Sequence, residues 1–460
     1  MKKINFAGYL FEPQKNLETN LPKYSSHHLI LCFSNRLIVT AKKDIFLSSS
    51  NKIDNIWIYE WQKNKTWASI YSYKPEILVD RILKIDDNKK LLYALAIDEK
   101  KSEIYILEID IINKRENIIC KNNLYNAHLK ENNKVIPIFS VEAKELSSRF
   151  LIFSVEPMDK FDISNYKSVF IFDIENKSLY QLPSQGQNFL NELEIQSTGL
   201  YNDKYILFKT GKIGDCEKLD IVMDEMKKED FDPKTLNVKQ QIYILPFEQF
   251  LMDLKNNQIE FSRHLVDFAD YEAVLTSSYL GWFENDCYYY VKTYTKQDKS
   301  VLIRVKFSEK GITEKEVIYS FDERIISNSI FTTYQILDSG KIKGKELFYI
   351  VKSFKSNKPE QLEIFYFGDK TKIKRIEPAL EENESIYLLN LRKNFFITAT
   401  AHFNLEEPVL SNHDKLLLTY KLYLLSTQKL IDRLDFVHMC YNIFIYENPD
   451  RKDEILIYFY

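Results

Sequence analysis

The residue types that could carry out chemistry do not form a common catalytic motif in this sequence. A glycine-rich phosphate loop, a C-x-x-C pair, a His-Glu zinc helix and a G-x-S-x-G nucleophile turn are all missing from the 460 residues. His27 and His28 are adjacent, but neighbouring residues on a strand point to opposite faces, so the two cannot readily share a metal. The sequence therefore predicts no catalytic residues, no metal site and no cofactor.

Acidic side chains form a first set of candidate residues. The stretch Gly211–Val238 holds eight acidic residues and three lysines between Asp215 and Asp232, and its middle has the apolar spacing of a short helix. Such a surface favours docking of another protein or peptide of basic or amphipathic character. The candidate partner-binding residues are Asp220, Met223, Asp224, Glu225, Met226, Asp270, Glu381 and Glu382.

Polar residues in short segments that open each repeat form a second set. Segments such as "LVDRIL", "LTSSY" and "FTTYQ" would be the innermost strands if the sheets surround an axis. A small molecule could then bind in the central channel, with Asp80, Arg81 and His438 as polar anchors. The candidate channel-lining residues are Asp80, Arg81, Ser277, Thr332, His438 and Asn442.

The elements that would position both sets are repeated hairpins. A strand-like segment, a short polar turn and a strongly apolar strand recur along the chain. The turns fall at Asn35, Asp87-Asn88, Ser147-Ser148, Asn202-Asp203, Asn285-Asp286, near Gly340, at Lys393-Asn394 and near Asp450. A third strand such as "IYILEID" or "IYILPFE" follows most hairpins, and a weaker fourth such as "ENIIC" or "QIEFS" comes next.

The apolar second strands are near-continuous rather than alternating. "CYYYVKTYT", which starts at Cys287, and "KLLYALAID" are examples. A strand reads this way when both of its faces are covered. We therefore expect Tyr288, Tyr289 and Tyr290 to pack in the core rather than to form a platform for a ligand.

Four antiparallel strands per repeat, without long helices between them, resemble the β-propeller superfamily across nearly the whole chain. No repeat signature of a particular propeller family is found. The resemblance implies an all-β fold of four-stranded blades, eight in number, with seven as the alternative. The eighth blade would be completed by the N-terminal segment Ile4–Phe11, which would close the ring.

We predict a single domain over residues 1–460, with 211–238 as an acidic, partly helical insertion in the fourth blade. The function predicted from these features is a non-catalytic protein- or peptide-binding scaffold that uses its loop face. The alternative is a small-molecule-binding or enzymatic propeller with its site in the central channel. The strands use up the chain, so no separate catalytic domain is expected.

Charge and composition exclude several partners. With 63 basic and 66 acidic residues the net charge is −3, which gives no field for a nucleic acid. The first residues contain no apolar signal segment, and no apolar run is long enough to span a membrane. The five scattered cysteines indicate reduced thiols and a cytoplasmic location. A monomer is expected.

Overall fold

A computed structural model describes the strands, their tight turns and a few short helices. The described residues are 3–9, 17–18, 28–33, 37–43, 53–61, 67–73, 77, 79–86, 88–98, 101–124, 139–157, 167–183, 187–213, 238–256, 258–269, 273–276, 282–284, 286–294, 299–308, 311–321, 334–342, 345–352, 361–366, 373–376, 384–390, 394–403, 416–425, 427–438, 443–447 and 454–459. The chain divides into two compact units. Unit 1 comprises Met1–Gln196, Glu248–Ile259 and Tyr441–Tyr460, and unit 2 comprises Ser197–Phe247 and Glu260–Cys440.

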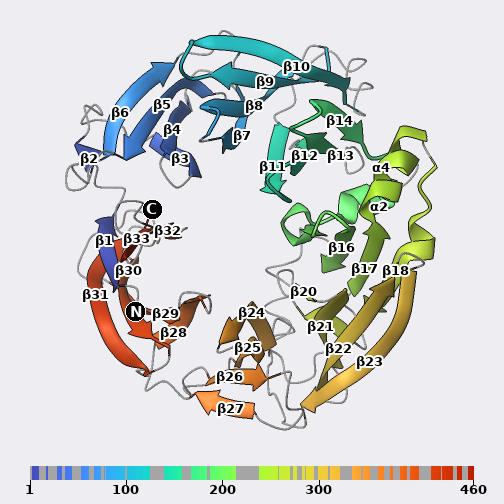
Figure 1. Ribbon diagram of the computed structural model, residues 1–460, viewed down its shortest axis with the longest axis vertical. Helices are drawn as coiled ribbons and strands as arrows, with labels where there is room; N and C mark the ends of the chain where they lie inside the picture. Colours follow the sequence, from blue (N-terminus) through green and yellow to red (C-terminus); the bar gives the residue numbers. More distant parts are fainter. Residues whose placement is uncertain are drawn as a thin grey trace. The chain divides into compact units, whose positions relative to one another are not determined.

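The described strands of unit 1 form four sheets, labelled in Figure 1. The first has the order β2-β6-β5-β4-β3, with β2 (Leu17–Glu18), β3 (His28–Phe33), β4 (Leu37–Lys43), β5 (Ile53–Trp61) and β6 (Trp67–Tyr73). The second consists of β7 (Arg81–Asp86), β8 (Leu91–Asp98), β9 (Glu103–Asp110) and β10 (Arg115–Asn123). The third consists of β11 (Phe139–Glu145), β12 (Phe150–Pro157), β13 (Ser168–Asp173) and β14 (Ser178–Gln181).

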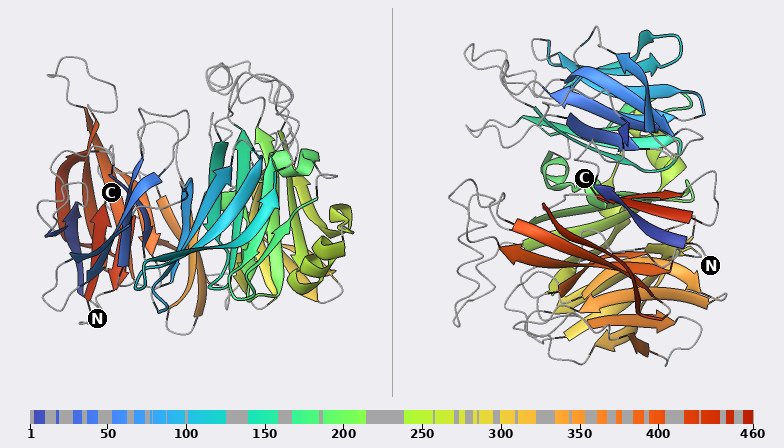
Figure 2. Two further views of the ribbon diagram at one scale, coloured as in Figure 1. Left: turned by 90° about the horizontal axis from the view of Figure 1, so that it is seen from above. Right: turned by 90° about the vertical axis from the view of Figure 1, so that its left-hand side faces the viewer.

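The fourth sheet of unit 1 joins the two ends of the chain. Its order is β1-β33-β32, with β1 (Lys3–Tyr9), β33 (Glu454–Phe459) and β32 (Ile443–Glu447). Figure 2 shows β1 beside β33, and the two pair in parallel from Lys3–Glu454 to Tyr9–Phe459. Of the segment Ile4–Phe11 that was predicted to complete the last blade, residues 4–9 thus pair with the C-terminal hairpin.

The described strands of unit 2 also form four sheets. The first consists of β15 (Gly199–Tyr201), β16 (Tyr205–Ile213), β17 (Val238–Pro246) and β18 (Leu265–Ala269), and the second of β19 (Ala273–Thr276), β20 (Trp282–Glu284), β21 (Cys287–Tyr294), β22 (Lys299–Ser308) and β23 (Gly311–Phe321). The third consists of β24 (Tyr334–Ile342), β25 (Lys345–Lys352), β26 (Gln361–Tyr366) and β27 (Ile373–Ile376). The fourth consists of β28 (Glu384–Asn390), β29 (Phe395–Phe403), β30 (Leu416–Leu424) and β31 (Lys429–His438). Sheets of four antiparallel strands, taken in chain order, are the architecture of a β-propeller, as predicted.

The hydrophobic cores lie between successive sheets, and β8 shows why its sequence is apolar throughout. Leu92, Ala94 and Ala96 pack against the β5 isoleucines of the preceding sheet. Leu95 and Ile97, on the opposite face, pack with residues of β12 and β13 in the following sheet. Because side chains alternate along a strand, an unbroken apolar run supplies two cores at once.

The tyrosine strand β21 is buried in the same way. Tyr288, Tyr289 and Tyr290 are at most 6% exposed. The rings of Tyr288 and Tyr290 stack at 5.5 Å within the core that β21 shares with β16 and β17. The Tyr290 hydroxyl donates to the buried carboxylate of Asp267 on β18. Packing is therefore the role of these side chains, as predicted.

Two hairpins of unit 1 share the sequence D-I-x-N-K, at 110–114 and 173–177. In each, the aspartate accepts hydrogen bonds from the backbone N–H groups two and three residues later and from the asparagine amide. The lysine ends each turn at positive φ, 55° for Lys114 and 50° for Lys177. This motif is readable in the sequence, but the hairpin pattern alone did not reveal it.

Helix α4 (Phe247–Asn256) corrects one strand assignment. The segment "QIEFS" was expected to be the fourth strand of its sheet, but that strand is β18, a few residues later. Phe247, Phe250 and Leu254 bury one face of α4, at the i, i+3, i+7 spacing of a helix. In the described part of the chain, the other short helices are α2 (Gln187–Glu192), η3 (Ile195–Ser197) and η6 (Phe261–His264).

Two further predictions need adjustment. The hairpin expected near Gly340 lies between Ile342 and Lys345, because β24 continues through Gly340. The ends of the predicted insertion belong to a ladder, since Ile213 of β16 pairs with Val238 of β17. Residues 214–237 lie outside the described part of the chain.

Candidate functional site

The first strands of three successive sheets, β3, β7 and β11, lie next to one another in unit 1. We call this line the first-strand seam. Each first strand pairs with only one neighbour in its own sheet, so its other edge carries backbone groups that need partners elsewhere. Polar side chains at the seam therefore either cap these edges or remain available to a ligand.

Asp80 and Arg81, two predicted channel residues, both lie at the seam but have different roles. The Asp80 carboxylate accepts a hydrogen bond from the backbone N–H of Ile97 at 2.7 Å, within its own sheet. Arg81, the first residue of β7, reaches the next sheet and donates from Nη1 to the Val141 carbonyl of β11 at 2.6 Å. Asp80 thus fixes its own sheet, whereas Arg81 bridges two sheets.

The Arg81 guanidinium is half-buried at this position. Burial lowers the pKa of Arg81, and the negative charge of Glu142 acts in the opposite direction. Val141 is its only hydrogen-bond partner among the described residues. A guanidinium has five N–H donors in a planar fork that matches carboxylate and phosphate oxygens, so this one retains capacity for an anion.

Two other long side chains make contacts at β11 of the seam. Lys144 of β11 donates to the Gln196 carbonyl at 2.6 Å, and the Gln196 amide donates in return to the Ala143 carbonyl at 3.5 Å. Burial lowers the pKa of Lys144. Side chains thus cap two carbonyls of β11, at Val141 and Ala143. These contacts hinder pairing of the β11 edge with another strand.

Three ion pairs join neighbouring sheets of unit 1. Lys90 contacts Glu60 at 2.8 Å, Lys177 contacts Glu108 at 2.9 Å, and Lys84 contacts Glu145. Arg81 and Glu142 also come from neighbouring sheets, but no ion pair joins them. The exposed Glu142 carboxylate has no hydrogen-bond or ion-pair partner among the described residues.

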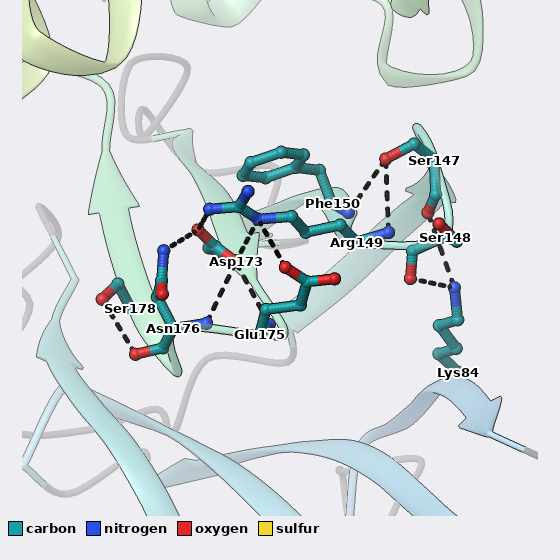
Figure 3. A network of polar contacts seen from close by, with 9 residues as sticks. All are labelled: Lys84, Ser147, Ser148, Arg149, Phe150, Asp173, Glu175, Asn176 and Ser178. Carbon is teal, nitrogen blue, oxygen red and sulfur yellow. Dashed lines mark hydrogen bonds and ion pairs between the residues drawn. The ribbon is translucent and has the colours of Figure 1, made fainter. Parts of the chain in front are cut away.

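Next to the seam, a second arginine forms a bidentate contact with a carboxylate (Figure 3). Arg149 donates from Nε and Nη2 to the two oxygens of Asp173, at 2.9 and 2.7 Å, and stacks over the Phe150 ring. Asp173 also holds the turn at 173–177. Lys84 donates to the Ser148 carbonyl at 2.8 Å. All these groups are satisfied by the fold, so we assign them a structural role.

In unit 2, one arrangement combines a histidine, a hydroxyl and a carboxylate. Thr419 donates to Asp435 at 3.2 Å, and its oxygen lies 3.0 Å from His402 Nε2. Because the single Thr419 proton is directed at Asp435, Nε2 of His402 must carry the donated proton. Thr419 is 1% exposed, so its hydroxyl cannot meet a substrate. This group is structural rather than a nucleophile–base pair.

Two buried carboxylates of unit 2 are fully paired. Asp267 accepts from Tyr290 and contacts Lys292 and Lys315 at 3.0 Å each. Burial opposes ionisation of Asp267, but the Tyr290 and Lys315 contacts outweigh it and lower the pKa. Glu384 accepts from Thr398 and pairs with Lys421 at 3.2 Å.

Most other predicted site residues lie outside the described part of the chain. This holds for all the predicted partner-binding residues, Asp220, Met223, Asp224, Glu225, Met226, Asp270, Glu381 and Glu382, and for Ser277, Thr332 and Asn442. The backbone of His438 ends β31 and pairs with Leu417, while its side chain is not described. The structure thus places Asp80 and Arg81 together and leaves the remaining candidates untested.

Glu142 was not among the predicted site residues. The segment "SVEAKE" carries charges at alternate positions within a first strand, and this pattern could have identified it. In the part of the chain that the structure describes, no cluster of His, Cys, Asp and Glu could hold a metal ion. No described helix is both long enough and apolar enough to cross a membrane.

Comparison with known proteins finds solved structures that are similar to this chain at low sequence identity. No family model and no curated protein matches the chain. A post-proline cleaving enzyme from Rickettsia typhi is 14% identical, with a TM-score of 0.41, over 86% of this chain and 48% of that one. Dipeptidyl peptidase 4 from Porphyromonas gingivalis is 10% identical, with a TM-score of 0.35, over 89% and 59%.

The β-propeller domain of the Trilobed protease from Pyrococcus furiosus is 12% identical, with a TM-score of 0.30. The match covers 90% of this chain and 97% of that domain. Against most of the other solved structures, the chain spans about half of their length.

These comparisons correct the predicted function. The main prediction was a non-catalytic protein- or peptide-binding scaffold, and it is contradicted because most of the solved neighbours are peptidases. The alternative, a small-molecule-binding or enzymatic propeller, agrees better with them. The site for that alternative is developed from the seam residues.

Proposed function

We propose that the chain is the propeller part of an enzyme that takes a small anionic substrate, and that Arg81 binds the anion at the first-strand seam. The observation that carries this proposal is the half-buried Arg81 guanidinium, which uses one donor on the Val141 carbonyl. A cation that is partly shielded from water attracts a ligand anion more strongly than an exposed cation does.

The contrast with Arg149 supports the choice of residue. Arg149 spends its fork on both oxygens of Asp173, so a ligand would have to displace a bidentate pair. Arg81 has no carboxylate in contact among the described residues, so an incoming carboxylate or phosphate would not have to displace one of them. Arg81 is therefore proposed to bind the ligand, whereas Arg149 stabilises the fold.

Substrate binding at Arg81 is tested by titrating the full chain with succinate, citrate and inorganic phosphate. A ligand at about 100 times its Kd raises the unfolding free energy by about 2.7 kcal/mol, which is visible as an increase in Tm. Arg81→Gln should abolish the increase and Arg81→Lys should weaken binding by about tenfold or more, because lysine lacks the planar fork.

The matched control is Arg115→Gln, which removes the same charge from the exposed start of β10. It should bind like the wild type. Conversion of each bound anion is followed by NMR over the same titration. If no anion binds in an Arg81-dependent manner, the proposal is wrong.

For the architecture, we propose a single domain of eight blades closed by the β1–β33 pair. Eight sheets in the described residues and the union of the two chain ends in one sheet support it. An experimental structure with seven blades, or with β1 outside the last one, would contradict it. The cytoplasmic location, the monomeric state and the acidic docking residues remain predictions.

A further inference from the structure

Two charged side chains at the first-strand seam, Arg81 and Glu142, indicate which chemical groups the ligand carries in addition to an anion. Arg81 on β7 and Glu142 on β11 lie on first strands that are in contact, and the negative charge of Glu142 acts to raise the pKa of Arg81. The Arg81 guanidinium is also anchored to the carbonyl of Val141, the residue just before Glu142. Even so, the two charged groups do not form an ion pair. A cation and an anion therefore stand near each other without contact.

This open arrangement differs from every other inter-sheet contact of opposite charges described above. Lys90–Glu60 and Lys177–Glu108 close to within 2.9 Å. Those pairs tie one sheet to the next. Arg81 and Glu142 also lie on neighbouring strands of two sheets, β7 and β11.

We infer that the seam binds a small zwitterion, a molecule with both a carboxylate and an ammonium group, such as an amino acid or a dipeptide. The ligand carboxylate takes the unused donors of the Arg81 fork, and the ligand ammonium donates to Glu142. This inference rests on the proposed function, since it names the substrate class of the same site. Arg81 and Glu142 are then both neutralised by one molecule.

Burial gives the two contacts different weights. Arg81 is half-buried and Glu142 is exposed, so the contact with the ligand carboxylate supplies most of the affinity. The contact with Glu142 then selects ligands that carry an amine over simple carboxylates. We expect a selectivity of about threefold to tenfold, in keeping with the modest strength of exposed ion pairs.

The test compares glycine, β-alanine, γ-aminobutyrate and glycylglycine with acetate, propionate, butyrate and N-acetylglycylglycine, respectively, by calorimetry on the full chain. The amines of graded length report which spacing fits between Arg81 and Glu142. One of them should bind threefold to tenfold more tightly than its partner without the amine. Glu142→Gln should remove this difference and leave carboxylate binding unchanged, while Glu248→Gln, an exposed carboxylate on α4, should preserve it.

Each result has a distinct meaning. If ligands with and without the amine bind equally to the wild type, the zwitterion inference fails and the Arg81 site stands. The same conclusion holds if Glu142→Gln leaves the selectivity intact. If none of these carboxylates binds while phosphate, succinate or citrate still binds in an Arg81-dependent manner, the zwitterion inference alone fails. If no anion binds, or if binding persists in Arg81→Gln, the proposed function fails and the inference fails with it.

Discussion

Glu384 in unit 2 and Glu142 in unit 1 both lie on the first strand of a sheet, but their surroundings are opposite. The Glu384 side chain is 0% exposed and is held by Lys421, Thr398 and Tyr423. The Glu142 side chain is exposed and has no partner among the described residues. The first is part of the core between strands, and the second is left for a ligand. The difference shows that a site is recognised here by what the fold leaves unpaired.

The largest effect on stability should come from removing Lys421, the ion-pair partner of Glu384. Lys421→Met removes the cation and leaves Glu384 buried without it, which should lower the unfolding free energy by about 3–5 kcal/mol. Urea denaturation of the variant measures this loss. Lys429→Met, an exposed lysine on β31, is the control and should change little. If both variants have the same stability, the buried pair does not hold this sheet together.

An intermediate effect is expected at Asp267, and it should depend on pH. Asp267→Asn weakens charge-assisted contacts with Tyr290 and two lysines, which should cost about 1.5–3 kcal/mol near neutral pH. The pKa of Asp267 lies below its ordinary value of 3.8, so its contribution is present above that pH and is lost as the pH falls through the lower value.

The difference between wild type and Asp267→Asn, measured by urea denaturation, should therefore shrink in acid. Asp203→Asn, at an exposed turn of the same unit, provides the control for general charge effects. A difference that stays constant from pH 7 to pH 3 would mean that the Asp267 charge does not stabilise the fold.

The smallest effect on stability should come from substituting Glu142, which forms no ion pair with Arg81. Glu142→Gln changes an exposed side chain without a described partner, so the unfolding free energy should stay within about 0.5 kcal/mol of the wild type. The same variant should change ligand selectivity. A loss of stability comparable to that of Lys421→Met would show that Glu142 is structural, and the contrast between the two glutamates would disappear.

The sequence predicted the repeat architecture because hairpin turns and two-sided apolar strands are local patterns. Asn202-Asp203 and Asp286 mark turns at positive φ, and "KLLYALAID" predicted a strand with both faces covered. The hairpin near Gly340 was misplaced by a few residues, since glycine occurs at both Gly340 and Gly344 and either could turn the chain. Helix α4 was missed because its start continues the apolar run of β17.

The candidate site was harder to predict from the sequence. Arg81 was selected for its place in a first strand, and the structure puts it at the seam. Asp80 was selected for the same reason, yet it serves the backbone of its own sheet. Glu142 was missed because its importance depends on Arg81, which lies on a different strand. Sequence patterns identify elements, whereas the pairing of charges between elements depends on packing that no single segment encodes.

The two faces of β8 also limit how such a chain can change in evolution. Leu95 and Ile97 belong to one core, and Leu92 and Ala94 belong to another. The β7–β10 sheet therefore contributes to the cores that it forms with the preceding and the following sheet. Removal of this sheet would strip apolar surface from two others at the same time. A blade can therefore be copied in tandem, as the two D-I-x-N-K turns suggest, but it cannot be excised as an independent module.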